Sequence, residues 1–299
     1  HSLQESNGSE YIMEDWDSKL SQIGCVVEGS DEEGIEIEVF PDRPDLLSHE
    51  TMARAARAFL GGEIQSPEIE TLDSGIILQV DSSLQSVRPV IMAAVVKGVE
   101  TGNNQEEIDE FIQTLMDHQE KLHLSIGRKR KFSSIGVHDL STLNPPFKVI
   151  TVPENHSFVP LAMEEKMTIK QILTEHPKGV EYANLMEELN DYPVIVDSND
   201  DILSFPPIIN GAHTTVNDST TDFFIDVTGW DERAVEACLL LICLSLAERG
   251  GKIEHVQVNG CDGQVRLTPN MKSKQHRVSD RLIHRILGLK LHSLEIAKA

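Results

Sequence analysis

The chain has 299 residues, of which 39% are hydrophobic and 25% are charged. This composition supports a sizeable core and excludes a chain that is disordered throughout. The 26 basic and 49 acidic residues give a net charge of −23, so the average surface repels nucleic acid and any contact with it must be local. The longest apolar run, residues 237–244, is far shorter than the roughly 20 residues that span a bilayer, so no membrane partner is expected.

The four cysteines, Cys25, Cys238, Cys243 and Cys261, show no CxxC pairing and no histidine spaced for zinc. Cys238 and Cys243 lie in an apolar helical pattern, where a thiol usually acts as a small hydrophobic side chain. We therefore expect a reducing, cytoplasmic compartment and no metal site in this chain.

At this length two domains are expected, with room for a third piece. Residues 1–72 form the first predicted unit, a small structural domain. Within it, residues 24–28 and 35–40 alternate as strands of a sheet with one wet face, and Ser48 is a good N-cap for the helix that follows. Residues 63–88 are acidic and loosely patterned and are the best linker candidate, with a short strand at residues 76–80 as the alternative.

The second predicted unit, residues 73–266, contains a strand at residues 90–99 and a helix over residues 105–122. Just beyond this helix lies the only dense basic run of the chain, Arg128, Lys129, Arg130 and Lys131. Because its charge opposes the acidic background, we expect the run to bind phosphates. The alternatives are a solvated surface and an internal ion-pair site.

His138 and Asp139 follow the basic run at the end of a predicted strand. Neighbouring residues on a strand face opposite ways, so a structural role is favoured over a catalytic dyad of these two side chains.

Three short apolar runs between residues 192 and 229 are rich in β-branched or aromatic side chains: 193–196, 202–205 and 223–227. They are predicted to form a meander of strands. On the third strand Asp226 and Thr228 face one way while Ile225 and Val227 face the other. A carboxylate beside a hydroxyl can hold a water; the alternative is that both residues cap the next helix.

A helix is expected from Asp231 to about residue 248, followed by a final strand at residues 253–258. A basic segment then leads into a helix over residues 279–287, and residues 267–299 are interpreted as the truncated start of a helical module. The expected fold class is therefore α+β: a small N-terminal α/β domain, then a larger mixed-sheet domain, then that helical start.

Five motifs occur in order along nearly the whole chain: PDRPDLLS, LSIGRKRKFSSIGVHDLSTLNPPF, HPKGVEYANL, VDSNDDILSFPPIIN and FFIDVTGWDERAV. Together they resemble the beta subunit of archaeal and eukaryotic cytosolic phenylalanyl-tRNA synthetase. The resemblance implies an editing domain, which hydrolyses the ester of tyrosine mischarged onto tRNA(Phe). It also implies two partners, tRNA(Phe) and an alpha subunit in a heterotetramer, with ATP and magnesium as cofactors of the complete synthetase and none for this part.

An editing site of this kind needs a slot for an aromatic ring, a polar group at its far end and a hydrolytic water at the ester. The resemblance implies that Ser204, Asp226 and Thr228 line the pocket, and it leaves open which of them meets the phenol and which the water. Asp226 is expected to be an exposed carboxylate that orients the water or the amino group of the substrate. The terminal ribose hydroxyl of the tRNA can help to activate the water, so no histidine is required.

The substrate slot is expected to come from the same strands, with Ile195 and Leu203 among its apolar walls and Asn210 among its polar groups. Two alternatives to an editing function remain. One is a non-catalytic scaffold that docks tRNA or another subunit, and the other is a free-standing deacylase. No DNA partner is expected.

Overall fold

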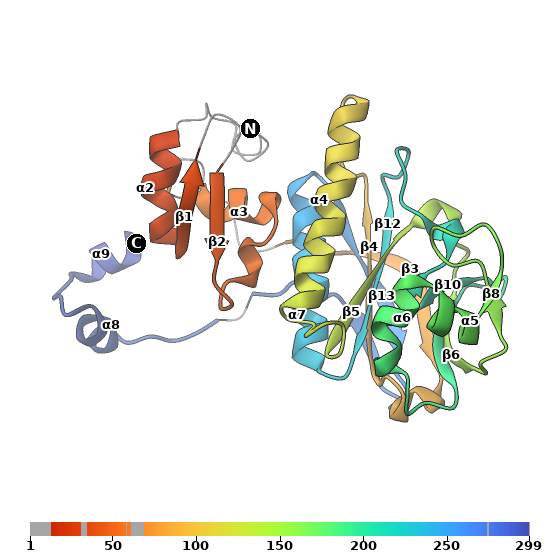
Figure 1. Cartoon of the computed structure of the whole chain (residues 1–299). Helices are drawn as coiled ribbons and strands as arrows, with labels where there is room; N and C mark the ends of the chain where they lie inside the picture. Colours follow the sequence, from red (N-terminus) through yellow and green to blue (C-terminus); the bar gives the residue numbers. More distant parts are fainter. Residues whose placement is uncertain (1–12, 31–34, 58, 61–68, 274, 299) are drawn as a thin grey trace.

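The structure, a computed structural model, describes residues 13–30, 35–57, 59–60, 69–273 and 275–298 (Figure 1). It shows a small N-terminal unit, a large sheet with helices around it, and an extended C-terminal arm that ends in two short helices. The predicted α+β class is confirmed, since the small unit is followed by a large sheet that mixes parallel and antiparallel strands. The bounds predicted for the three domains stay a prediction.

Among the residues that the structure describes, the N-terminal unit packs two helices against a two-stranded antiparallel sheet. Its core contains Trp16, Leu20, Leu46 and Met52. Ser48 accepts a hydrogen bond from the backbone of Thr51 at 3.2 Å, so its predicted role as an N-cap is confirmed. The elements are α2 (Met13–Ile23), β1 (Cys25–Ser30), β2 (Ile35–Val39), η1 (Pro44–Leu46) and α3 (His49–Ala56).

Among the described residues, ten strands form the large sheet, in the order β11-β10-β9-β6-β3-β13-β4-β12-β5 with β14 paired to β13. Strand β13 runs parallel to β3, and β3 parallel to β6, while the other pairs are antiparallel. The strands are β3 (Leu72–Val80), β4 (Val90–Lys97), β5 (Ser133–Asp139), β6 (Phe147–Val152), β9 (Tyr192–Val196), β10 (Ile202–Phe205), β11 (Ile209–Asn210), β12 (Phe223–Gly229), β13 (Lys252–Asn259) and β14 (Val265–Thr268).

Strand β3 occupies the middle of this sheet, so the linker expected at residues 63–88 is wrong from Leu72 onward. The acidic side chains that suggested a linker lie mostly before the strand. Ile76, Leu78 and Val80 alternate inward, which is the short strand considered as the alternative, extended at its start. Residues 63–68 of the expected linker lie outside the described residues.

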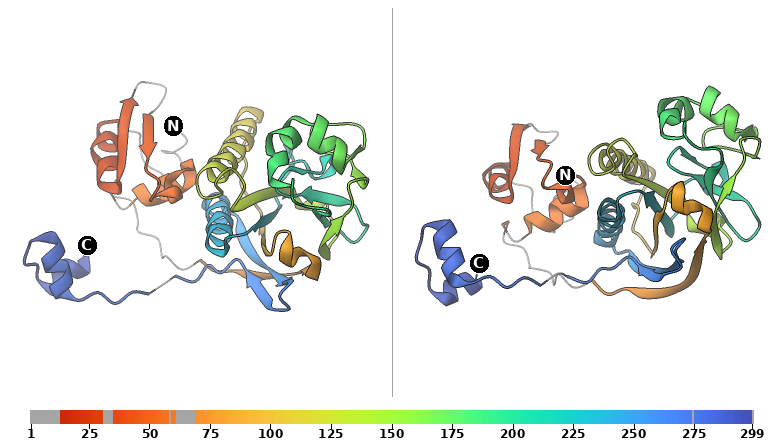
Figure 2. Two further views of the ribbon diagram at one scale, coloured as in Figure 1. Left: turned by 60° about the horizontal axis from the view of Figure 1, so that its bottom comes forward. Right: turned by 90° about the horizontal axis from the view of Figure 1, so that it is seen from below.

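The predicted meander is confirmed for its first two strands, β9 and β10, which pair with each other, but it is wrong for its third strand, β12. Strand β10 pairs with β9 and β11, whereas β12 lies between β4 and β5, far from β10 in the sheet order. The sheet nevertheless curls strongly (Figure 2), and one buried cluster takes side chains from β10, β12 and the strands between them, including Leu203, Phe224 and Val149. This curl brings β10 and β12 together.

Helices cover both ends of the curled sheet. Helices α4 (Gln105–Leu124) and α7 (Glu232–Glu248) pack on the outer face of β4, β12 and β5, where Ile225 and Val227 point as predicted. Helices α5 (Ile169–Glu175) and α6 (Pro177–Tyr182) pack on β9 and β10. The remaining short elements are η2 (Ser82–Ser86), η3 (Leu140–Thr142), β7 (Ser157–Phe158), β8 (Met167–Thr168), η4 (Ala183–Leu185) and η5 (Ala212–Thr214).

The N-terminal unit packs on α7 through α3, and polar side chains that are largely removed from solvent lie at this contact; Figure 1 shows the two units. Arg54 of α3 and Arg57, the residue at the C-terminal cap of α3, both bind the carboxylate of Glu248. The Glu50 carboxylate accepts from Ser245 at 2.9 Å and from Arg249 at 2.7 Å. The pairing and the hydrogen bonds offset the desolvation cost of these partly buried charges.

The C-terminal arm carries helices α8 (Asp280–Leu287) and α9 (Ser293–Lys298) away from the sheet (Figure 2). The predicted helix at residues 279–287 is confirmed, with Ser279 as its N-cap and Gly288 in the left-handed conformation at its end. Within the described part of the chain, no helix is both long and apolar enough to cross a membrane.

Candidate active site

A cavity of about 360 Å³ lies in the seam between the two end strands of the curled sheet. Asn210 Nδ2 of β11 donates to Val137 O of β5 across this seam at 3.4 Å. Pro206 and Pro207, which follow β10, have no N–H groups to donate, so this segment cannot extend the ladder and the seam stays open. The lining residues are Ile112, Met116, Gln119, Glu120, Arg130, Ser134, Ile135, Gly136, Val137, Leu161, Lys178, Ser204, Pro206, Pro207, Ile208, Ile209, Asn210, Thr214, Thr215, Val216 and Asp226.

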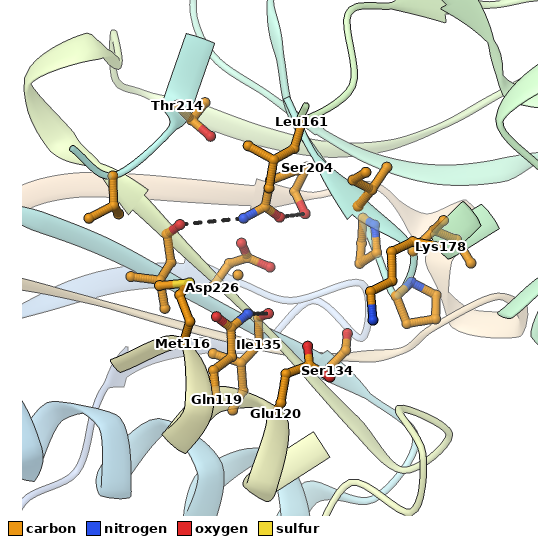
Figure 3. Close-up of a pocket in the computed structure, with 18 of the residues that line it drawn as sticks. Met116, Gln119, Glu120, Ser134, Ile135, Leu161, Lys178, Ser204, Thr214 and Asp226 are labelled. Atoms are coloured by element: carbon orange, nitrogen blue, oxygen red, sulfur yellow. Dashed lines mark hydrogen bonds between the residues drawn. The ribbon is translucent and has the colours of Figure 1, made fainter. Parts of the chain in front are cut away.

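The polar groups of the cavity are distributed along it (Figure 3). Asp226 lies between Ser204 and Thr214 on one side and Glu120 and Ser134 on the other. Ser204 comes from β10 and Asp226 from β12, so the predicted closeness of these two residues arises from the curl of the sheet and not from strand pairing.

Asp226 is 1% exposed, so the expectation of an exposed carboxylate is wrong. Its Oδ2 lies 2.7 Å from His138 Nε2, and His138 Nδ1 lies 2.8 Å from Thr214 Oγ1. The sequence suggested only Asp139 as a neighbour of His138, but the partners of its ring are Asp226 and Thr214. His138 therefore supports a carboxylate of the candidate site. The helix cap at α7 is Asp231, which accepts from Ala234, so the alternative that Asp226 and Thr228 form the cap is excluded.

Gly136 provides the room for this pair. A Cβ at Gly136 would collide with Asp226 Oδ2 and would lie 2.7 Å from His138 Nε2. The three residues share one face of the sheet because Asp226 stands opposite Gly136 in the ladder between β12 and β5. Only glycine therefore permits the carboxylate to bind the imidazole across this position.

Thr228 does not line the cavity, which corrects its predicted place in the pocket wall. Its Oγ1 accepts from Arg88 Nε at 2.7 Å and lies 3.2 Å from Ser134 Oγ, so it stands directly behind Ser134. Arg88 is itself buried, and burial lowers the pKa of its guanidinium to about 9, an effect that the nearby charge of Asp226 opposes. The guanidinium therefore remains charged at neutral pH.

The apolar walls come from other residues than predicted. Ile195 and Leu203 are fully buried in the cluster inside the curled sheet and do not face the cavity. Ser204 and Asn210 do line it, as expected, and Ser204 Oγ donates to Asn210 Oδ1 at 3.3 Å. The apolar lining is instead supplied by α4 and the segments after β10 and η5, including Ile112, Met116 and Val216.

Glu120 is a polar lining residue that the sequence analysis missed. Its Oε1 lies 3.2 Å from His123 Nδ1 and 2.5 Å from Arg130 Nη2. The hydrogen bond from His123 and the charge of Arg130 lower the pKa of Glu120 to about 2, against the effect of partial burial. His123 accepts from the backbone of Ile135 through Nε2, so Nδ1 carries the proton given to Glu120.

The basic run divides into two parts. Arg130 is 7% exposed, and its Nη1 donates to the carbonyls of Pro207 and Ile208 at 3.1 and 3.0 Å. Arg130 thus stabilises the cavity wall from inside the protein and is not available to bind phosphates, which corrects its predicted role. Its ion pair with Glu120 matches the alternative of an internal ion-pair site. Arg128, Lys129 and Lys131, the neighbours of Arg130 in the sequence, are exposed.

One signal in the sequence could have revealed one of the two missed residues, Glu120 and Arg88. Glu120 is four residues beyond Met116 and eight beyond Ile112, so it continues a stripe of α4 that faces the cavity. Arg88, between a valine and a proline, offered no such signal.

Among the described residues, no group of three or more His, Cys, Asp or Glu side chains is arranged to hold a metal ion.

Residues 87–240 match the model of the B3/4 domain family. The phenylalanine–tRNA ligase beta subunit of Methanococcoides burtonii is 45% identical over 278 residues, which are 93% of this chain and 50% of that protein. The corresponding subunit of Archaeoglobus fulgidus is 44% identical over 94% of this chain and 50% of its own length. The chain thus spans about half the length of the curated relatives it matches.

A solved structure agrees with these relatives. The crystal structure of an N-terminal fragment of the phenylalanyl-tRNA synthetase beta subunit from Pyrococcus horikoshii superposes with a TM-score of 0.91 at 32% identity, covering 99% of this chain and 85% of that one. The resemblance predicted from the five motifs is confirmed: the chain belongs to the B3/4 domain family and is similar, along nearly its whole length, to the beta subunit of archaeal phenylalanyl-tRNA synthetase.

Proposed function

We propose that this chain hydrolyses the ester of tyrosine mischarged onto tRNA(Phe), as the editing part of a synthetase beta subunit. The observation that carries the proposal is the meeting of Ser204 and Asp226, from strands far apart in the sheet order, at one cavity with largely apolar walls. Its volume of about 360 Å³ falls within the range of about 300–1,000 Å³ that is usual for small-molecule sites.

The arrangement of Ser204 and Asn210 suits a phenol. Ser204 Oγ gives its proton to Asn210 Oδ1 at 3.3 Å, so its lone pairs are left to accept the proton of a phenol hydroxyl. A phenylalanine ring in the same place would leave this buried oxygen without that bond. A site that hydrogen-bonds a substrate hydroxyl rejects the analogue that lacks it, and tyrosine is thereby selected for hydrolysis.

The opposite end of the cavity suits the amino group and the ester. The ionised Glu120, with Oε1 held by His123 and Arg130, offers its other oxygen to the ammonium group of the aminoacyl ester. Asp226, with Oδ2 held by His138, offers its other oxygen to the attacking water. The terminal ribose hydroxyl of the tRNA assists in activating that water, and the exposed Arg128, Lys129 and Lys131 hold tRNA phosphates.

The wider context is part of the same proposal. The matched relatives are phenylalanine–tRNA ligase beta subunits, so we infer tRNA(Phe) and an alpha subunit as partners, a heterotetramer, and a cytoplasmic location. ATP and magnesium belong to aminoacylation by the complete synthetase, and no step of the hydrolysis proposed here uses them.

The test is release of labelled tyrosine from Tyr-tRNA(Phe) by the purified chain, with Phe-tRNA(Phe) as the matched substrate. We expect tyrosine to be released faster than phenylalanine, and Asp226→Ala and Asp226→Asn to lower the rate by on the order of 10- to 1000-fold while remaining folded. Binding of the tRNA without loss of either ester would support the scaffold function and overturn the proposal.

A further inference from the structure

Arg88 is a buried cation without a carboxylate partner. It is 2% exposed, and no described carboxylate lies within ion-pair distance of it. Its hydrogen bonds go instead to neutral oxygens, namely Thr228 Oγ1 and Thr228 O at 2.7 Å each, and Ser134 Oγ and Arg130 O at 3.1 Å each. Burying a charge costs free energy unless hydrogen bonds compensate for the lost water, so the hydroxyls of Thr228 and Ser134 are held in place by their bonds to the guanidinium.

The direction of the hydrogen bonds between the two hydroxyls follows from counting protons. Thr228 Oγ1 and Ser134 Oγ each accept from Arg88 and lie 3.2 Å apart, so one of them donates to the other. If Ser134 donated, the proton of Thr228 would be left without a described acceptor on a side chain that is 0% exposed. Thr228 therefore donates to Ser134, because an unpaired buried donor is costly.

This direction leaves the proton of Ser134 free. Ser134 Oγ already accepts from Arg88 and from Thr228, and Ser134 lines the cavity (Figure 3). Its O–H group can therefore donate into the cavity. Two accepted bonds, one of them from a cation, polarise the hydroxyl and strengthen it as a donor.

We propose that Ser134 is a catalytic residue that donates its hydroxyl hydrogen to the ester carbonyl oxygen, and that Arg88 and Thr228 are positioning residues for that hydrogen bond. This inference rests on the proposed function. The Ser134 donor stands near Asp226, which holds the water, so both groups can meet one ester carbon. A fixed donor aimed at the oxygen where negative charge develops is among the strongest contributions to ester hydrolysis.

The reaction balances without further reagents. The water oxygen bonds to the ester carbon, and the carbonyl electron pair moves onto the oxygen that accepts from Ser134. When that pair returns, the bond from the carbon to the ribose oxygen breaks. The proton given up by the water passes to the departing ribose oxygen, so tyrosine and uncharged tRNA are formed and Ser134 keeps its proton throughout.

Single-turnover deacylation of Tyr-tRNA(Phe) by Ser134→Ala tests the assignment, and Ser133→Ala is the matched control. Ser133 is the preceding residue on β5 and contacts Cys238 on the other face of the sheet. We expect Ser134→Ala to lower kcat on the order of 100-fold with KM little changed, and Ser133→Ala to keep the parent rate. A raised KM with unchanged kcat would overturn the role, because the hydroxyl would then bind the ground state only.

A double-mutant cycle separates the positioning residues from a merely structural effect. Thr228→Val should lower kcat, Thr228→Ser should restore it, and Thr228→Val should add little in the Ser134→Ala background, because both act through one hydrogen bond. Full additivity of the two changes would overturn the relay. If Ser134→Ala hydrolyses at the parent rate while Asp226→Ala is inactive, the inference fails and the proposed function stands. An inactive parent would instead defeat the proposed function.

Discussion

His138 Nε2 lies 2.7 Å from Asp226 Oδ2, and the two side chains meet across Gly136. In the ladder between β5 and β12, His138 stands opposite Phe224 and Asp226 opposite Gly136, so the contact is diagonal. At this distance one proton lies between the two atoms, and Thr214 Oγ1, bound to His138 Nδ1 at 2.8 Å, fixes the far side of the ring. The carboxylate that faces the cavity is therefore held from behind.

Replacing His138 should misplace this carboxylate. We expect His138→Leu to lower deacylation of Tyr-tRNA(Phe) by about 100-fold, the cost of a displaced reacting group, with binding of tRNA unchanged. His138→Gln retains a side-chain N–H donor and should recover part of the rate. Equal rates for parent and His138→Leu would show that Asp226 does not depend on the ring.

The glycine between them gives a second test. In Gly136→Ala the new Cβ would lie 2.7 Å from His138 Nε2 and collide with Asp226, so we expect a loss of stability of about 1–3 kcal/mol together with loss of deacylation. Gly29→Ala is the matched control, since a Cβ there meets its nearest atom at 3.7 Å. Urea unfolding and single-turnover assays of both variants measure the difference. A Gly136→Ala variant with parent activity would contradict the account.

The alternation along β12 was predictable because it depends only on local period. Ile225 and Val227 reach the outer core and Asp226 reaches the inner face, as the sequence indicated. Of the residues that the resemblance implied, Ser204 and Asp226 line the cavity and Thr228 does not, and Asn210, expected from the strands themselves, lines it as well.

Strand pairing was only partly predictable from the same pattern. The neighbouring runs that form β9 and β10 do pair, but the next run, β12, pairs with β4 and β5, which come from earlier segments of the chain. The burial of Arg130 was not predictable either, because it depends on an unusual backbone conformation. Arg128, Lys129 and Arg130 all have positive φ values, of 46°, 54° and 64°, a backbone that non-glycine residues rarely adopt and that composition does not reveal.

The division of the basic run predicts two different phenotypes. Replacing Arg128, Lys129 and Lys131 together by alanine should weaken tRNA binding and reduce the slope of log affinity against log salt by about one for each phosphate that the variant no longer binds. Hydrolysis of a minimal tyrosyl ester should stay near the parent rate. Arg130→Ala should do the reverse, because its guanidinium holds Glu120 and the carbonyls of the cavity wall. The measurement is the affinity for tRNA at several salt concentrations. An unchanged affinity in the triple variant would show that these three side chains are only a solvated surface.

His118 predicts how the stability of the protein depends on pH. It lies on α4, on the same buried stripe as Leu115 and Leu122, and is 1% exposed. Burial lowers the pKa of His118 to about 4, although the charge of Glu50 raises it and those of Lys121 and His49 add to the lowering. Neither ring nitrogen has a hydrogen-bond partner among the described residues, so a proton on the ring would be unsatisfied.

The direction in which pH changes the free energy of unfolding follows from the number of protons that the folded and unfolded states bind. An unfolded His118 takes up a proton near pH 6.5, whereas the folded ring stays neutral until about pH 4. Between these values the unfolded state binds more protons, so stability falls as the pH is lowered. Between pH 7.5 and 5.0 this one group should cost the folded state on the order of 2 kcal/mol, at about 1.4 kcal/mol per pH unit below 6.5.

His118→Leu should remove that part of the loss, because leucine fills the buried site and does not titrate. The measurement is the free energy of unfolding in urea at pH 7.5 and at pH 5.0, for the parent, for His118→Leu, and for His156→Leu, whose ring is exposed. The difference between the two pH values should be smaller in His118→Leu than in the parent and unchanged in His156→Leu, since the other titrating groups are shared. An equal loss in all three proteins would mean that the His118 ring takes up its proton in the folded state as readily as in the unfolded chain.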